Sequence, residues 1–82
     1  MKAPKHFVKD CENAVESMEV LLEDNNETNV VMAAIDLKSY YNHPHERLEL
    51  TEEETVVDNK VFNLSQRVEE ELGIRLLEVN TY

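Results

Sequence analysis

An apolar stripe through residues 7 to 22 predicts the first helix of the chain. The stripe repeats at spacings of four and three residues and consists of Phe7, Cys11, Ala14, Met18 and Leu21. Pro4 suits the first turn of a helix, where its missing N–H costs nothing. Two asparagines at positions 25 and 26 interrupt the pattern. We therefore expect a helix from Pro4 to Glu23 or Asp24.

A second apolar segment, from Val30 to Tyr41, fits either a helix or a buried strand. Its helical stripe consists of Val30, Ala33, Ala34, Leu37, Tyr40 and Tyr41. Residues 30 to 35 are also continuously apolar, as a buried strand would be. The length of the pattern favours a helix, capped by Asn26 or Thr28 and ended before Pro44, because the residue preceding a proline avoids the helical conformation. Apolar residues on more than one side predict that this helix is the central, most buried one.

The third segment carries local signals for both ends of a helix. Thr51 and Glu54 have the spacing of a capping box, in which each side chain bonds to the backbone N–H of the other residue. Apolar residues then recur at Val57, Val61, Leu64, Val68 and Leu72. Gly73 stands where a left-handed C-terminal cap is expected. A single helix between Thr51 and Gly73 is our preferred prediction.

A β-hairpin is the alternative for the same region. Residues 49 to 57 and 60 to 64 would form two strands around Asp58-Asn59, followed by a short helix from Asn63. The protein would then be α+β, with its hairpin between Leu48 and Leu64.

The fold predicted from the three stripes is all-α, a small three-helix bundle with a C-terminal extension, and a single domain covers residues 1–82. Glycine occurs once and proline twice, which is too few for many short strands. The extension, Ile74 to Tyr82, is partly apolar, so we expect it to pack against the bundle or a partner. Because so thin a core gains stability from self-association, we also expect a homo-oligomer.

The net charge and the lone cysteine limit the functions that are compatible with this chain. Eighteen acidic residues against eight basic ones give a formal net charge of -10 at pH 7. We expect no direct contact with nucleic acid, because such binding depends on Lys and Arg neutralising phosphates. No apolar run approaches the roughly 18 to 20 residues of a transmembrane helix, and Cys11 alone cannot form an intrachain disulfide. These features predict a cytoplasmic protein without membrane contact.

The most distinctive charged pattern is a row of four glutamates on the first predicted helix. Glu12, Glu16, Glu19 and Glu23 recur at spacings of four, three and four residues. Successive carboxylates therefore stand about 5 to 6 Å apart along the helix axis, and such a row can imitate the phosphates of a nucleic acid strand. It can equally be a solvated helix face, although no Lys or Arg between residues 10 and 37 balances it.

A second group of glutamates lies in the predicted last turn of the third helix, at positions 69 to 71. Carboxylates are unfavourable there, because the helix dipole places its negative end at the C-terminus. This unfavourable location suggests that the three glutamates bind a partner outside the monomer. The predicted partner-binding residues are Glu12, Glu16, Glu19, Glu23, Glu69, Glu70 and Glu71.

Candidate catalytic and metal-binding residues are few. His43, His45 and Glu46 form a local cluster of metal-ligand types, and a zinc or nickel site there would need a further carboxylate or His6. We favour a polar loop over a metal site and expect no cofactor. Cys11 lies in the apolar stripe, so we expect a core thiol and not a nucleophile. No phosphate-binding loop or nucleophile motif is present in the sequence, which argues against an enzyme.

Three functional hypotheses follow. The first is a non-enzymatic inhibitor, of the kind found in phages and mobile elements, whose glutamates occupy a basic nucleic-acid-binding surface of another protein. Complementary charge would speed the encounter and suppress wrong partners. The second is a helical adaptor or chaperone that holds a partner through apolar seams. The third is an oligomer that sequesters a small anion with its basic N-terminus and with Arg47, Lys60, Arg67 or Arg75.

Overall fold

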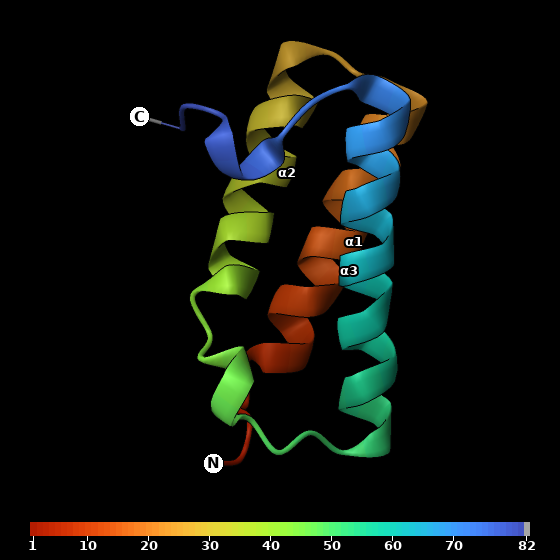
Figure 1. The fold of residues 1–82 in the computed structure, drawn as a ribbon. Helices are drawn as coiled ribbons and strands as arrows, with labels where there is room; N and C mark the ends of the chain where they lie inside the picture. The colour runs from red at the N-terminus through yellow and green to blue at the C-terminus, as the bar shows by residue number, and fades with distance from the viewer. Residues whose placement is uncertain (82) are drawn as a thin grey trace.

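Three α-helices run in alternating directions along the long axis of the bundle, so that the first and third point the same way (Figure 1). In the computed structural model, which describes residues 1–81, the helices are α1 (Phe7–Glu23), α2 (Glu27–Tyr41) and α3 (Glu52–Leu72). Two short 3-10 helices, η1 (His45–Arg47) and η2 (Leu76–Glu78), follow α2 and α3. The predicted all-α bundle is confirmed, because the described residues contain no strand beyond one isolated bridge.

The first helix begins three residues later than the start predicted at Pro4. Phe7 is its first residue, and the Phe7 N–H donates to the Pro4 carbonyl at 3.0 Å in a turn that precedes the helix. His6 occupies the N-cap position without a side-chain cap hydrogen bond. The predicted end at Glu23 is confirmed.

The central helix is α1, and the prediction that the second helix is the most buried one is wrong. α1 packs against both other helices and buries six side chains between them: Phe7, Cys11, Ala14, Val15, Met18 and Leu21. On α2, Met32 and Ile35 remain 53% and 44% exposed. The apolar run of α2 extends around more of the helix than its neighbours cover, so composition alone overstated the burial of α2.

The second segment is a helix, and the alternative of a buried strand is wrong. Its cap is Asn26, whose side-chain Oδ1 accepts from the Asn29 N–H at 2.8 Å. Tyr40 and Tyr41 point in different directions on this helix. The first is 4% exposed and belongs to the core, while the second is 42% exposed.

Both ends of α3 follow the local signals. The Thr51 hydroxyl accepts from the Glu54 N–H and the Glu54 carboxylate accepts from the Thr51 N–H, which completes the capping box. Gly73 ends the helix in the left-handed conformation with φ of 64°. The hairpin alternative is wrong, since Asp58 and Asn59 lie inside this continuous helix.

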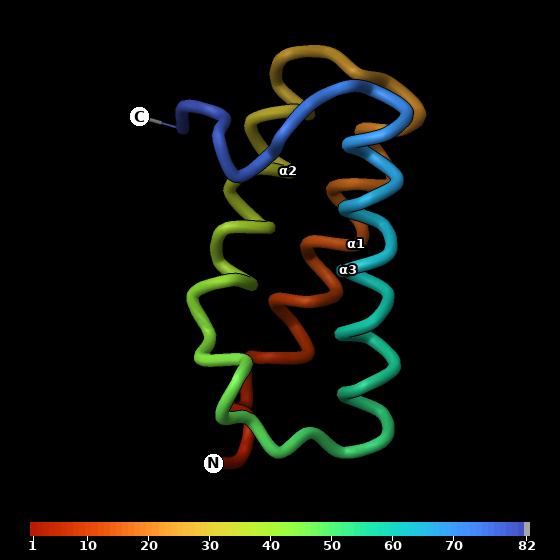
Figure 2. The backbone as a smooth tube through the Cα atoms, in the orientation of Figure 1, coloured from red at the N-terminus to blue at the C-terminus, as the bar shows by residue number. Residues whose placement is uncertain are grey.

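The C-terminal extension crosses one end of the bundle from α3 to α2 (Figure 2). Leu76 of η2 is 1% exposed, and the Lys38 ammonium donates to the Val79 carbonyl at 2.6 Å. The extension therefore packs against the bundle as predicted, up to Thr81. Tyr82, the last residue of the predicted extension, lies outside the described residues.

The chain start and the α2–α3 connection meet at the opposite end of the bundle (Figure 1). Lys2 and Glu49 form the isolated bridge, and the Glu49 N–H donates to the Met1 carbonyl at 2.7 Å. η1 lies in the same connection. These contacts hold the α2–α3 connection against the segment that precedes α1.

Candidate functional site

The row of glutamates on α1 is fully presented to solvent. Glu12, Glu16, Glu19 and Glu23 are all exposed, while the opposite side of the helix forms the core. Among the described residues, the ion pairs within 4.0 Å include none of these four side chains. The accessibility that partner binding requires is present, and the binding itself stays a prediction.

Two shallow grooves flank the row. Glu16 borders the groove between α1 and α2, which has a volume of about 250 Å³ and exposes the apolar side chains of Val20 and Met32. Glu19 borders the groove between α1 and α3, together with Lys60 and Arg67. The sequence pattern gave no sign of these two cations beside the row, because they come from another helix.

Arg67 lies between the two groups of glutamates. Its Nε donates to the Glu71 carboxylate on α3, and its side chain also lines a groove with Glu19 and Glu23 of α1. Glu69, Glu70 and Glu71 are exposed. Glu71 of the second group is therefore linked to the row across the groove between α1 and α3. We call the seven exposed glutamates the acidic surface, made of Glu12, Glu16, Glu19, Glu23, Glu69, Glu70 and Glu71.

The parallel direction of α1 and α3 concentrates negative charge at one end of the bundle. Both helices have their C-termini there (Figure 1), and neither has a basic residue in its last turn. The negative ends of two helix dipoles consequently add to the carboxylates of Glu23 and of residues 69 to 71. We call this the acidic end, made of Glu19, Glu23, Glu69, Glu70 and Glu71.

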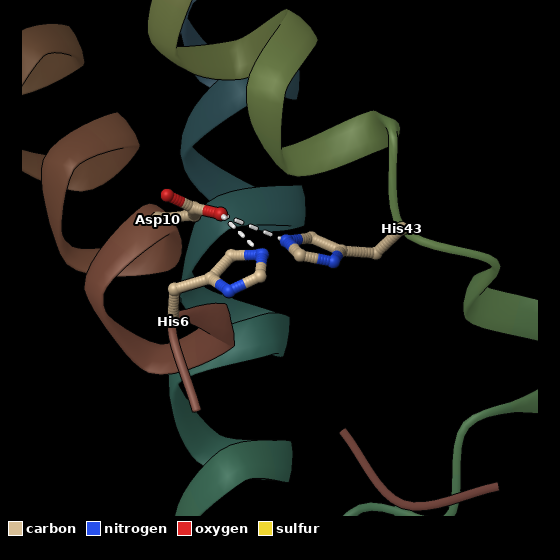
Figure 3. Close-up of side chains that lie close together, drawn as sticks. All are labelled: His6, Asp10 and His43. Carbon is tan, nitrogen blue, oxygen red and sulfur yellow. Dashed lines mark hydrogen bonds and ion pairs between the residues drawn. The ribbon is translucent and has the colours of Figure 1, made fainter. Parts of the chain in front are cut away.

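The other end of the bundle brings two histidines to one carboxylate. His43 Nε2 donates to Asp10 Oδ2 at 2.9 Å, and His6 Nε2 lies 3.9 Å from the same oxygen. Figure 3 shows both imidazoles turned toward Asp10, one from the start of α1 and the other from the loop after α2. The His43 side chain is 7% exposed and that of Asp10 is 23% exposed, whereas that of His6 is 67% exposed.

His45 belongs to a different group of contacts from His43. Its ring packs against Tyr40 with the centroids 4.4 Å apart, and its Nε2 lies 4.0 Å from Asp58 Oδ1. Glu46 is exposed. The sequence had suggested a cluster of His43, His45 and Glu46 that a further carboxylate or His6 would complete. The structure brings His43 and His6 together around the carboxylate of Asp10, and it leaves His45 and Glu46 outside this group. We call the whole region the histidine end, made of His6, Asp10, Tyr40, His43, His45 and Asp58.

Tyr40 joins α2 to α3 within the histidine end. Its hydroxyl donates to Asp58 Oδ1. Burial raises the pKa of Tyr40 above its ordinary value, and the hydrogen bond to Asp58 raises it further. An open cleft of about 540 Å³ lies beside this pair and is bordered by Tyr41 and Phe62.

Cys11 is a core residue, as predicted. Its side chain is 0% exposed, and burial raises the pKa of the thiol to about 12, with smaller contributions from Asp58 and Asp10. A thiol with such a pKa is protonated at neutral pH and is a poor nucleophile.

The comparisons with known proteins assign no function to the chain. No family model matches the chain, and no curated protein and no solved structure is detectably similar to it. Among the described residues, no helix has the length and apolar character needed to cross a membrane.

Asp10 is the site residue that the sequence analysis missed. Its position four residues after His6 was a usable signal, because residues at this spacing share one face of a helix. The contact with His43 had no such signal. It depends on where the loop after α2 lies against the beginning of α1.

Proposed function

We propose that the protein is a non-enzymatic binding module whose acidic surface occupies a basic, nucleic-acid-binding site on another protein. The observation that carries this proposal is the position of Arg67, between Glu19 and Glu23 on one side and Glu71 on the other. This position brings Glu71 of the second group close to the row on α1.

The electrostatics of this surface suit a basic partner. Carboxylates on α1 are spaced by about 5 to 6 Å along the helix, and the four that form the row have no ion pair within 4.0 Å in the described chain. A surface of one sign steers an oppositely charged partner during encounter and disfavours partners of like charge. A protein surface that binds nucleic acid carries the complementary charge.

The anion-sequestering hypothesis has less support from the positions of the basic residues. η1, which contains Arg47, lies at the histidine end, while Arg75 follows α3 at the acidic end (Figure 1). Arg67 already binds Glu71 and Arg75 lies 3.7 Å from Glu78. The named arginines therefore do not converge, and an anion site on a single chain would be limited to Arg47 and the basic N-terminus, which lie at the same end of the bundle.

The decisive experiment compares two charge-matched variants in binding to a partner. One variant changes Glu12, Glu16, Glu19 and Glu23 to Gln, and the control changes Glu46, Glu49, Glu53 and Glu78 to Gln. Both remove the same charge from exposed positions. Immobilised protein captures candidate partners from a lysate, and each purified candidate is then titrated with wild type and both variants over a range of salt concentrations.

The proposal requires that the row variant lose most of its affinity while the control retains it. Wild-type binding should also weaken steeply with ionic strength, and duplex DNA should compete for the same site on the partner. If the row variant binds as tightly as the control, the proposal fails. The exposed apolar side chains of Val20 and Met32 then become the next positions to test, as the adaptor hypothesis requires.

A further inference from the structure

We propose that His6, Asp10 and His43 form a three-ligand site for a divalent transition-metal cation of the zinc, cobalt or nickel type. This site lies where α1 begins, away from the acidic end, and its function does not depend on the proposed binding of a basic partner. The inference rests on the convergence of two imidazoles on one carboxylate oxygen (Figure 3).

The distances are close to those of a coordinated ion. The candidate ligand atoms of the three residues all lie within 4.8 Å of one another. Ligands of a tetrahedral zinc ion, bound at about 2.0 to 2.1 Å, stand roughly 3.3 Å apart. The separation of 2.9 Å between His43 Nε2 and Asp10 Oδ2 is already near that value. A movement of His6 by about 1 Å would bring the third atom into range, and its exposed side chain is free to make this adjustment.

The fold holds two of the three ligands in place before any ion binds. His6 and Asp10 are four residues apart at the start of α1, so they project from the same face of the helix. The ring of the fully buried Phe7 packs edge-on against His43 with the centroids 5.2 Å apart. This contact and the hydrogen bond to Asp10 fix the orientation of the His43 ring. To bind an ion, the neutral His43 ring would move its single proton from Nε2, where it is donated to Asp10, to Nδ1, which leaves the Nε2 lone pair free for the ion.

The ligand set also selects the class of ion. Two imidazole nitrogens and one carboxylate favour zinc, cobalt or nickel over magnesium and calcium, which prefer oxygen ligands alone. Three protein ligands leave at least one coordination position for water. The 67% exposure of the His6 side chain gives solvent and ions direct access to the site.

Cobalt is the best probe, because a tetrahedral cobalt ion absorbs visible light much more strongly than the octahedral hydrated ion does. Untagged protein is titrated with cobalt chloride, and zinc is then added to displace the bound cobalt. We expect saturable binding of one cobalt per chain and complete displacement by zinc. The absence of binding at metal concentrations up to about 1 mM, which corresponds to very weak affinity, would overturn the proposal.

Variants assign the binding to these residues. His6→Ala removes an exposed ligand and should leave the far-ultraviolet circular dichroism unchanged, while His45→Gln removes a histidine outside the cluster. Because even the loss of a supporting hydrogen bond typically costs metal affinity about 10- to 100-fold, His6→Ala should weaken binding at least tenfold. Asp10→Asn should weaken it similarly, and His45→Gln should not. Equal affinity of the His6→Ala and His45→Gln proteins would contradict the assignment.

A spectroscopic measurement identifies the ligands without mutation. Nitrogen-15 spectra of the histidine side chains, recorded while zinc is added, should show changes at the Nε2 atoms of His6 and His43. The resonances of His45 should change little. If His45 responds instead of His6, the ion binds elsewhere in the loop and the proposed site is wrong.

Discussion

The two ends of the bundle use acidic side chains in opposite ways. At the histidine end, Asp10 and Asp58 are only 23% and 24% exposed. Asp10 accepts a hydrogen bond from the His43 ring, and Asp58 accepts one from the Tyr40 hydroxyl. At the acidic end, all five glutamates are exposed. Among them, Glu71 pairs with Arg67 within its own helix.

This difference separates the residues that stabilise the fold from those that are free to bind. Breaking a hydrogen bond to a largely buried group leaves a polar atom unsatisfied, which costs about 1 to 3 kcal/mol. Changing an exposed carboxylate usually alters stability by at most about 0.5 kcal/mol. The histidine end should therefore be sensitive to substitution and the acidic end tolerant of it. The following predictions test this contrast, from the largest expected effect to the smallest.

Replacing Phe7 by alanine should have the largest effect on stability. Phe7 is 0% exposed and contacts the rings of Tyr40, His43 and His45. Truncating a buried phenylalanine costs about 3 to 5 kcal/mol, as measured by urea denaturation. Phe62→Ala is the matched control, because Phe62 is 50% exposed and its loss should cost only about 0.5 kcal/mol. Similar losses in the two variants would show that the core does not extend to the histidine end.

Alkaline pH should lower the free energy of unfolding, because it ionises Cys11 and Tyr40 at or next to the histidine end. The pKa of Cys11 is raised from 9.0 to about 12 in the folded state, so folding favours the neutral thiol. Its stabilising contribution is complete below pH 9 and is lost as the pH rises toward 12, by about 1.4 kcal/mol for each pH unit. Tyr40, whose pKa is also raised from its ordinary value of 10.0, adds to this loss at higher pH.

Urea titrations at pH 8, 9 and 10 measure the contribution of Cys11. The free energy of unfolding of the wild type should fall between pH 9 and 10, and the Cys11→Ala variant should show a flatter dependence over the same interval. An unchanged slope in the variant would mean that other groups cause the alkaline loss.

Removal of the hydroxyl group should have different effects on stability at the two adjacent tyrosines. Tyr40→Phe deletes the hydrogen bond to Asp58 and leaves that carboxylate without its donor from α2, which should cost about 1 to 2 kcal/mol. Tyr41→Phe removes the same atom from a side chain that is 42% exposed, and it should change stability by less than about 0.5 kcal/mol. Thermal and urea unfolding of both variants provide the comparison. The prediction fails if Tyr41→Phe is the more damaging change.

Gly73→Ala should cost about 1 kcal/mol at the acidic end, for a backbone reason. Gly73 has φ of +64°, and an added Cβ would meet nothing within 4 Å. The cost therefore comes from the left-handed conformation alone, which alanine disfavours. Gly73→Asn is the control, because asparagine tolerates this conformation better. If asparagine destabilises the protein as much as alanine does, the left-handed cap is not the source of the cost.

Removing charge from the acidic end should have the smallest effect on stability. Changing Glu69, Glu70 and Glu71 to Gln removes unfavourable interactions with the helix dipole, so the folded state should gain a few tenths of a kcal/mol from each of the first two residues. The gain from Glu71 should be smaller, because this change also removes its ion pair with Arg67. Moderate salt should raise the melting temperature of the wild type, because screening weakens its self-repulsion. The increase should be smaller in the triple variant. A melting temperature that stays flat or falls with salt would contradict the view that these carboxylates are mostly unpaired.

Most of the fold could be predicted because its signals are local. The capping box of Thr51 and Glu54, the left-handed Gly73 and the stripe that begins at Phe7 each depend on residues within a few positions of one another. The start of α1 was predicted three residues early, since Pro4 is compatible both with a first helical turn and with the turn that precedes the helix.

The two candidate sites also differ in how far local sequence signals could predict them. Exposure of the seven glutamates followed from their positions on the helices. The cations beside them did not, because Lys60 and Arg67 come from α3 and the row from α1. The histidine end was even less predictable. His43 meets Asp10 only because the chain reverses direction between α1 and α2, which returns the loop after α2 to the start of α1.

The sequence by itself favoured three helices over a strand or a hairpin, and it predicted the two caps of the third helix, the buried character of Cys11 and the exposure of the acidic residues. Spacing and local hydrogen bonds are sufficient for these features. Only the tertiary structure decided that α1 is the central helix, that Arg67 links the two groups of glutamates, and that two histidines share Asp10. These features depend on how the helices pack, and the local pattern of a helix specifies which face is apolar but not which neighbour covers it.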